Sequence, residues 1–171
     1  MKRDWKATMT VRLWALRNVF LLWMIGPRII EVNDRRCEMV VPLNWRTRRR
    51  DIHAMYLGTL CMGADIAGGL IAFQIMTRSK DRLSFVFKDI RGEFFKRAED
   101  DVQFVCEDGP LIQEMVARAR ASGEREEALV RVVARVPKKL GDEPVAQFEL
   151  TLSVKRSAGV SPATVGRPAR P

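Results

Sequence analysis

Asp65 is the only charged residue in the long apolar segment from Met55 to Met76. Burying a carboxylate without a partner costs several kcal/mol, so this acid must be paired, protonated or used in chemistry. A partly desolvated carboxyl group has a raised pKa and can accept a proton from water as a general base. Asp65 is therefore the first candidate for a catalytic residue, and the alternative is a structural acid bonded to backbone or to an arginine.

The segment around Asp65 predicts a central helix over about residues 55–76. It carries several glycines, although glycine is disfavoured in a helix interior by roughly 1 kcal/mol relative to alanine. Small residues let neighbouring backbone approach a helix closely, so the composition predicts a helix that is tightly wrapped by another element. The small residues are Gly58, Gly63, Ala64, Ala67, Gly68 and Ala72.

The remaining reactive side chains exclude several kinds of site. His53 is the only histidine, so a multi-histidine metal site cannot form and a serine triad would depend on this imidazole. Cys37, Cys61 and Cys106 are odd in number and lack the spacing of metal ligands. We expect no metal and no cofactor. Cysteines in apolar patterns favour a reducing compartment, and we expect a cytoplasmic protein.

Positive charge is concentrated in the first third of the chain. The net charge is +9, and residues 1–50 contain 12 Lys and Arg against four acids. Such a region could meet nucleic acid, anionic lipid, coenzyme A phosphates or an acidic carrier protein, or could simply be a solvated face. No nucleic-acid motif or aromatic stacking platform is recognisable, so we do not expect nucleic-acid binding.

Four arginines in one short loop form a candidate phosphate clamp, because the guanidinium fork matches phosphate oxygens. A run of charge can equally be a solvated loop. The residues are Arg46, Arg48, Arg49 and Arg50.

A membrane span is not expected near the N-terminus. The apolar stretch between Val11 and Ile30 is interrupted by Arg12 and Arg17, and it falls short of about 20 residues. A helix lying in a membrane interface is one alternative, and packing on the chain's own domain is the other. The residues that suggest the first are Trp5, Trp14 and Trp23, with Lys2, Arg3, Lys6, Arg12 and Arg17 beside them.

Periodicity and turn residues predict one α+β domain over residues 1–156, with an antiparallel sheet around the central helix. An N-terminal helix over about 8–25 comes first, and Asn33-Asp34 turns a pair of strands. Asp108 should cap a helix that ends near Gly123. The expected strands are 28–32, 37–41, 83–90 with a bulged continuation over 92–98, 102–106, 127–136 and 145–155. Residues 157–171 lack any period and are expected to be a disordered tail.

This order and the central segment resemble the hotdog fold of acyl-thioester enzymes, over roughly residues 10–155. The chain looks most like a domain-of-unknown-function branch related to the phenylacetate-pathway (PaaI-like) thioesterases. In those enzymes an Asn, a Gly and a His-Gly-Gly precede a helix whose acid lies nine residues after the His. Here Arg50 stands at the Asn position, His53 at the Gly and Tyr56-Leu57-Gly58 at the His-Gly-Gly, while Asp65 matches the acid. The stretch from Phe85 to Ala98 also looks like that branch.

The resemblance implies a homodimer with two central helices under a continuous sheet, and it leaves a tetramer open. The acid of one chain would act with backbone N–H groups of Leu57 and Gly58 from the other, which would hold the thioester carbonyl. Tyr56 could donate a hydrogen bond to that carbonyl, and His53 lies in the same loop. The implied substrate is an acyl-CoA or acyl-carrier thioester. The alternative is a homodimer that binds acyl chains or lipids without catalysis.

Overall fold

One antiparallel sheet of six strands forms the body of the protein, in the order β1-β2-β4-β5-β6-β3. The structure is a computed structural model, and it describes residues 4–78 and 83–156. The predicted tail over 157–171 lies outside these residues. The strands are β1 Arg28–Val32, β2 Cys37–Val41, β3 Leu83–Phe94, β4 Val102–Cys106, β5 Glu126–Arg135 and β6 Pro144–Arg156.

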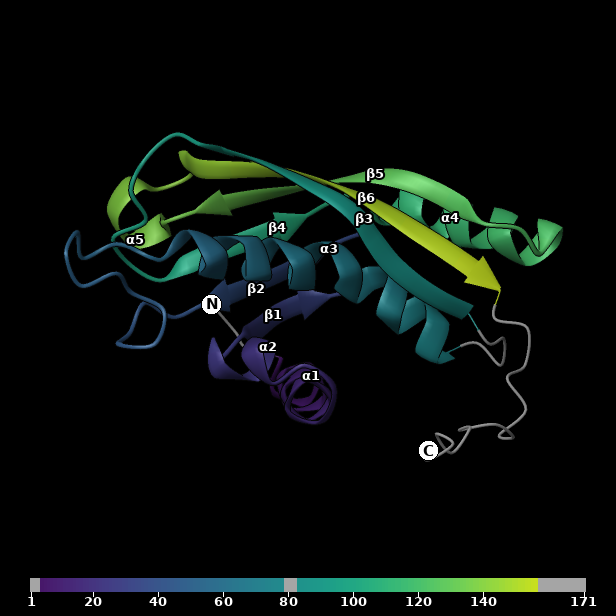
Figure 1. The fold of residues 1–171 in the computed structure, drawn as a ribbon, viewed down its shortest axis with the longest axis horizontal. Coiled ribbons are helices and arrows are strands. Elements are labelled where there is room, and N and C mark those ends of the chain that lie inside the picture. The colour runs from purple at the N-terminus through teal and green to yellow at the C-terminus, as the bar shows by residue number, and fades with distance from the viewer. Residues whose placement is uncertain (1–3, 79–82, 157–171) are drawn as a thin grey trace, which may run out of the picture.

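Helix α3 (Leu57–Arg78) lies along one face of this sheet, as the sequence predicted for about residues 55–76 (Figure 1). Its middle is buried because glycines allow the strands to come close. A side chain at Gly63 would overlap the ring of Phe104, and Gly68 lies against Val132. By length and composition α3 alone among the described helices could span a membrane, but 61% of its apolar window is buried inside the fold.

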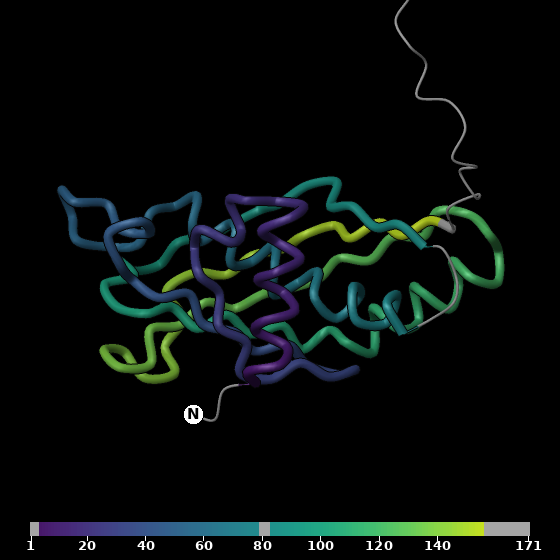
Figure 2. Tube along the Cα trace, turned by 90° about the horizontal axis from the view of Figure 1, so that it is seen from below, coloured from purple at the N-terminus to yellow at the C-terminus, as the bar shows by residue number. Residues whose placement is uncertain are grey.

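The N-terminal segment forms two helices where one was predicted over about 8–25: α1 (Trp5–Asn18) and α2 (Phe20–Met24). The chain breaks at Val19, whose φ of −144° is extended. Helix α1 begins earlier than predicted, because the Asp4 carboxylate accepts a hydrogen bond from the N–H of Ala7 at 2.9 Å. It crosses beneath α3 at a steep angle (Figures 1 and 2).

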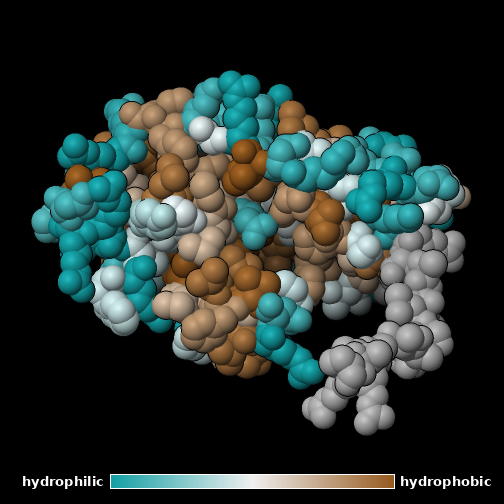
Figure 3. Space-filling view, viewed as in Figure 1, coloured by the Kyte–Doolittle hydropathy of each residue, from teal (hydrophilic) through white to brown (hydrophobic). Residues whose placement is uncertain are grey.

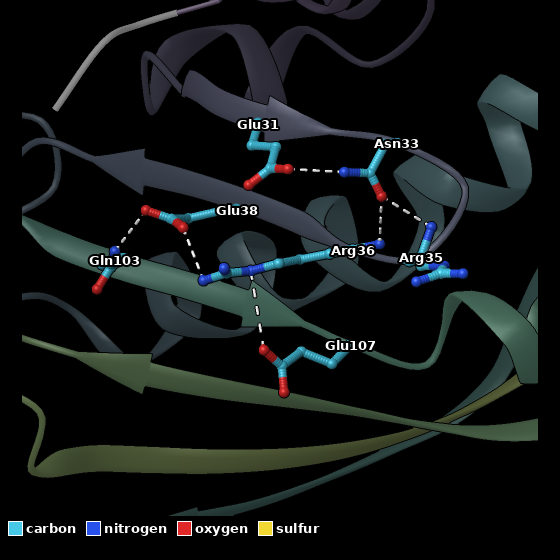
Figure 4. Close-up of polar contacts among 7 residues, drawn as sticks. All are labelled: Glu31, Asn33, Arg35, Arg36, Glu38, Gln103 and Glu107. Atoms are coloured by element: carbon cyan, nitrogen blue, oxygen red, sulfur yellow. Dashed lines mark hydrogen bonds and ion pairs between the residues drawn. The ribbon is translucent and has the colours of Figure 1, made fainter.

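The turn between β1 and β2 forms at the predicted Asn33-Asp34, and Figure 4 shows how side chains hold it. The Asn33 Oδ1 accepts hydrogen bonds from the N–H groups of Arg35 and Arg36 at 2.8 and 2.9 Å. Arg36 then donates to Glu38 at 2.8 Å. On the other side, Glu38 accepts from Gln103 of β4 at 2.6 Å, so this network joins the turn to two neighbouring strands.

Strand β3 runs past residue 90, as predicted, but stops short of the expected end at residue 98. The pairing with β6 shifts between Phe87 and Ile90, which places the bulge earlier than the expected 92–98. The strand ends at Phe94, so residues 95–98 are outside it. Because β6 is the only partner of β3 in the described chain, this long strand forms an edge of the sheet.

The C-terminal half otherwise follows the prediction. Helix α4 (Gly109–Ser122) is closed by Gly123, whose φ of +72° suits glycine. Asp108 stands at the start of α4 but does not cap it, because its carboxylate accepts the N–H of Arg131 at 2.6 Å instead. A short helix not predicted from the sequence, α5 (Pro137–Leu140), lies between β5 and β6.

Candidate active site

Asp65 lies half-buried on α3 and has no hydrogen bond or ion pair to any described residue. Burial raises the pKa of its carboxyl group above the ordinary value, with no charged neighbour to oppose the shift. An unpaired, partly desolvated acid carries an unfavourable free energy in the isolated chain. This is the electrostatic state that a general base requires.

Two hollows meet at Asp65. The first is an apolar cavity of about 160 Å³ between α3 and the two N-terminal helices. It is lined by Trp14 and Val19 on one side and by Phe73 of α3 and Phe85 of β3 on the other. The second is a groove of about 380 Å³ along β3. Asp65 is therefore placed between an apolar pocket and an open approach from the sheet edge.

The start of α3 supplies the other predicted half of the site. Tyr56 and Leu57 are exposed, and the N–H of Tyr56 is fixed by the carbonyl of Thr47 at 2.8 Å. A Cβ on Gly58 would lie 2.5 Å from the Tyr56 ring, so only glycine allows that ring to fold over the helix start. The first N–H groups of any helix lack partners within the helix, and here they point to an accessible end.

The loop before α3 is held by Thr47, which sequence reasoning did not single out. Its buried hydroxyl donates to the Pro42 carbonyl at 2.7 Å and accepts the N–H of Asn44 at 2.9 Å. The same loop contains His53, exposed, with a φ of +55°. That backbone conformation suits glycine, which is the residue expected there from the resemblance. The loop geometry alone does not account for a histidine at this position, and no contact in the described chain places its imidazole against Asp65.

The four loop arginines do not converge as one clamp. Arg49 forms an ion pair with Asp51, which lowers the pKa of that carboxyl group. Arg46 lies over its neighbour Trp45, with 5.8 Å between its guanidinium carbon and the ring centre. Arg48 and Arg50 are exposed, and the structure gives neither a side-chain partner among the described residues. These two are the arginines free to meet a phosphate.

One chain cannot bring the acid and the helix start together. Asp65 follows Gly58 by seven residues, which is about 10 Å along a helix. A reacting carbonyl must lie about 3 Å from its N–H donors and within reach of the base. A complete site therefore requires a second chain that brings its own helix start to this Asp65, and the two halves seen in one chain would then belong to different sites.

Sequence reasoning missed the wall that encloses the apolar cavity. Val11, Ala15 and Leu22 of α1 and α2 close it from outside. The spacing of these residues predicted only that the helix has an apolar face. It did not predict which surface of the protein that face covers. Cys61 borders the groove, but burial raises the pKa of its thiol, so it is not a ready nucleophile. Within the described residues no cluster of side chains could hold a metal ion.

Comparison with solved structures shows the architecture. A protein of unknown function from Chlorobaculum tepidum has a TM-score of 0.76 at 9% identity, over 91% of this chain and 98% of its own. A thioesterase from Haemophilus influenzae has a TM-score of 0.64 at 12% identity, over 90% of this chain and 93% of its own. A mutant thioesterase from Pseudomonas aeruginosa also gives 0.64 at 12%, over 92% and 100%. No protein-family model and no curated protein matches the sequence.

The chain has the hotdog fold. The α+β arrangement expected from the sequence is thereby confirmed, including the long helix wrapped by an antiparallel sheet and the helix at the N-terminus. Thioesterases recur among the similar hotdog structures. At such low identity the comparison shows the fold, and the chemistry rests on the residues of this chain.

Proposed function

We propose that the protein is a hotdog thioesterase that hydrolyses an acyl-CoA or acyl-carrier thioester, with Asp65 as general base. One observation carries the proposal: a single unpaired carboxyl group of raised pKa borders an apolar cavity. An acyl chain requires the cavity, and activation of water requires the acid. The occurrence of thioesterases among proteins of the same fold supports this function.

The proposed reaction uses a water molecule as nucleophile. Asp65 takes a proton from the water while the oxygen of the water bonds to the thioester carbonyl carbon. The N–H groups of Leu57 and Gly58 from a second chain hold the negative oxygen of the tetrahedral intermediate. The carbonyl then re-forms, the C–S bond breaks, and the thiolate receives the proton from Asp65 to leave as a thiol. In this mechanism the Tyr56 hydroxyl of that second chain donates a hydrogen bond to the same oxygen.

The size of the cavity suggests the class of acyl group. An apolar cavity of about 150 Å³ in another protein holds benzene, and the cavity here has about 160 Å³. We therefore expect short or ring-sized acyl groups to fit within one chain. A longer chain would have to extend into the groove along β3.

The direct test is hydrolysis of a panel of acyl-CoA esters by the wild type and by Asp65→Asn. We expect a loss of at least about 100-fold in kcat, which is the lower range for a positioned general base. Asp89→Asn is the matched control. Asp89 borders the same groove but accepts a hydrogen bond from Thr151 at 2.9 Å, so its loss should leave kcat unchanged.

Turnover that survives Asp65→Asn would refute the mechanism. No turnover of any ester by the wild type, with saturable binding of acyl-CoA, would favour the second candidate, an acyl-binding homodimer without catalysis. The apolar cavity supports that candidate as well. The residues at the helix start also favour it, because Arg50 and Tyr56 stand where the resembling enzymes carry Asn and His.

Recognition of the coenzyme by Arg48 and Arg50 is part of the same proposal. A double reversal, Arg48→Glu with Arg50→Glu, should raise KM for an acyl-CoA about tenfold or more and leave kcat unchanged, because phosphate contacts lie far from the reacting carbonyl. The corresponding acyl-pantetheine lacks the nucleotide phosphates, so its KM should not change. An equal rise for both substrates would show that the loop has been distorted and would contradict the clamp.

A further inference from the structure

The outward face of the two N-terminal helices is an exposed apolar surface. In α1 the residues on the inner face, Thr8, Val11 and Ala15, are buried. Apolar residues recur every three or four positions on the opposite face and continue into α2. This outer patch consists of Trp5, Met9, Leu13, Leu16, Phe20 and Leu21, all of them exposed.

The patch is large for side chains that meet water. Leu13 and Leu21 are 60% and 62% exposed, and Phe20 is 54% exposed. In Figure 3 hydrophobic residues gather below the centre of the molecule, over α1 and α2. A contiguous apolar surface of this kind marks an interaction site with a protein or a membrane.

The charges beside the patch distinguish between these partners. Lys6 and Arg17 lie on one side of the apolar stripe and Arg12 lies on the other, by their positions along the helix. The only acid in this segment is Asp4, whose carboxylate is engaged in capping α1. A second copy of the same face would place like charges against one another without acids to pair them. An anionic lipid surface would instead complement these cations.

We propose that α1 and α2 dock the protein on an anionic membrane surface, with the outer patch in the interfacial layer. Tryptophan and phenylalanine suit this layer, and basic residues beside an apolar stripe are typical of helices that lie in it. Asp4 and Thr8 fix the orientation of α1. Thr8 accepts the N–H of Ile29 at 2.9 Å and donates to the Asp4 carbonyl at 2.7 Å. The patch is thus held outward by the fold.

Docking would bring the acyl cavity close to the lipid. The inner faces of the same two helices form the outer wall of that cavity, through Val11, Trp14 and Leu22. A ligand that partitions into the bilayer would then have to cross only one layer of helix to reach Asp65. The docking itself does not depend on hydrolysis, so its failure and the failure of the thioesterase proposal are distinguishable.

The test is co-sedimentation of the full chain with vesicles. One set contains phosphatidylcholine alone, and the other contains phosphatidylcholine with one quarter phosphatidylglycerol. We expect binding to the anionic vesicles and at least about tenfold weaker binding to the neutral ones, with a further loss at high salt. Lys6→Glu with Arg17→Glu should reduce the anionic binding about tenfold or more.

Two control variants separate local from general effects. Arg35→Glu with Arg97→Glu makes the same change in net charge at exposed positions outside the patch, and should bind far better than Lys6→Glu with Arg17→Glu. Leu13→Ser with Leu21→Ser should lose binding, whereas Leu111→Ser with Leu129→Ser removes exposed leucines from α4 and β5 and should retain it. Thermal melting of each variant shows that it is folded.

A depth measurement gives an independent readout. Lipids brominated in their acyl chains should quench tryptophan fluorescence of the docked protein, and Trp5→Phe should remove part of that quenching. Absence of binding to anionic vesicles would overturn the proposal. Equal binding by Lys6→Glu with Arg17→Glu and by its control would also do so. If Leu13→Ser with Leu21→Ser instead reduces the mass of the particle in solution, the patch is a contact between copies and the proposal is wrong.

Discussion

At the scale of single residues, Asp65 is informative because it has no partner within the described chain. Most half-buried acids in proteins are explained by an arginine, a lysine or a set of backbone N–H groups. Here desolvation is the only cause that acts on the pKa of the carboxyl group, and it raises that pKa. Ionisation of Asp65 is thus less favourable in the isolated fold than in water, which a structural role would not require.

This imbalance predicts a pH dependence of stability. Because the pKa of Asp65 is higher in the folded than in the unfolded chain, the folded state binds more protons, and its contribution to stability is lost as pH rises through the folded pKa. Asp65→Asn should therefore raise the Tm at pH 7 by a few degrees, about 2–4 °C per kcal/mol. Below the unfolded pKa of about 3.9 the difference should vanish. Calorimetry of both proteins across pH measures it, and a lower Tm of the variant at pH 7 would show that the carboxylate is stabilised by a partner.

At the scale of elements, α3 is built around glycine, but its glycines differ in what they contact. A Cβ at Gly63 would overlap the Phe104 ring, whereas one at Gly68 would lie 3.5 Å from Val132, at ordinary van der Waals distance. Replacement of glycine by alanine is therefore expected to have opposite effects on stability at these two positions, which lie about one and a half turns apart. The first glycine allows close approach of a strand, and the second leaves room for a methyl group.

The expected result of Gly63→Ala is a loss of about 1–3 kcal/mol in unfolding free energy, because the core must shift to accept the extra carbon. Gly68→Ala should be neutral or gain up to about 1 kcal/mol from its better helix propensity. Urea denaturation of both variants provides the comparison, each serving as the other's control. If Gly63→Ala proved as stable as Gly68→Ala, the tight contact with Phe104 would not be what selects glycine in this helix.

The sequence predicted these elements well wherever a local signal was strong. Alternation in β6 and the small-residue run in α3 determine which faces are buried, so both were found. The break at Val19 was missed because no glycine or proline marks it. Asp108 looked like a cap because its competitor, the N–H of Arg131, is 23 residues away along the chain. A hydrogen-bond partner that is distant along the chain cannot be recognised from the neighbouring sequence.

The candidate site likewise contains one residue that could be recognised from the sequence and other features that could not. Asp65 could be recognised because a charge in an apolar helix is conspicuous in sequence. The cavity beside it could not, because its walls come from α1, α2, α3 and β3, and their mutual placement is a property of the whole fold. His53 and the four arginines were grouped by nearness along the chain. The structure shows instead that Arg49 is committed to Asp51.

At the scale of the whole molecule, the edge formed by β3 is open. Side chains that share the helix-covered face with Leu150 of β6 include Ile90 and Phe94, and these are 45% and 43% exposed because α3 does not extend over them. A long edge strand with apolar residues is a template for pairing with another chain. The homodimer that we propose would pair this edge and would bring a second α3 onto the uncovered face.

This arrangement links oligomeric state to catalysis, because Asp65 and the helix start of one chain are too far apart to act together. Phe94→Arg should convert the dimer to a folded monomer and abolish thioester hydrolysis, although Phe94 lines neither the cavity nor the groove at Asp65. Leu129→Arg is the matched control, since Leu129 is similarly exposed, at 45%, but lies on β5, inside the sheet and away from its edge. It should remain dimeric and active. Light scattering after gel filtration gives the mass, and the acyl-CoA assay gives the rate. A monomeric Phe94→Arg variant that retains wild-type kcat would show that one chain suffices, and the shared site would have to be abandoned.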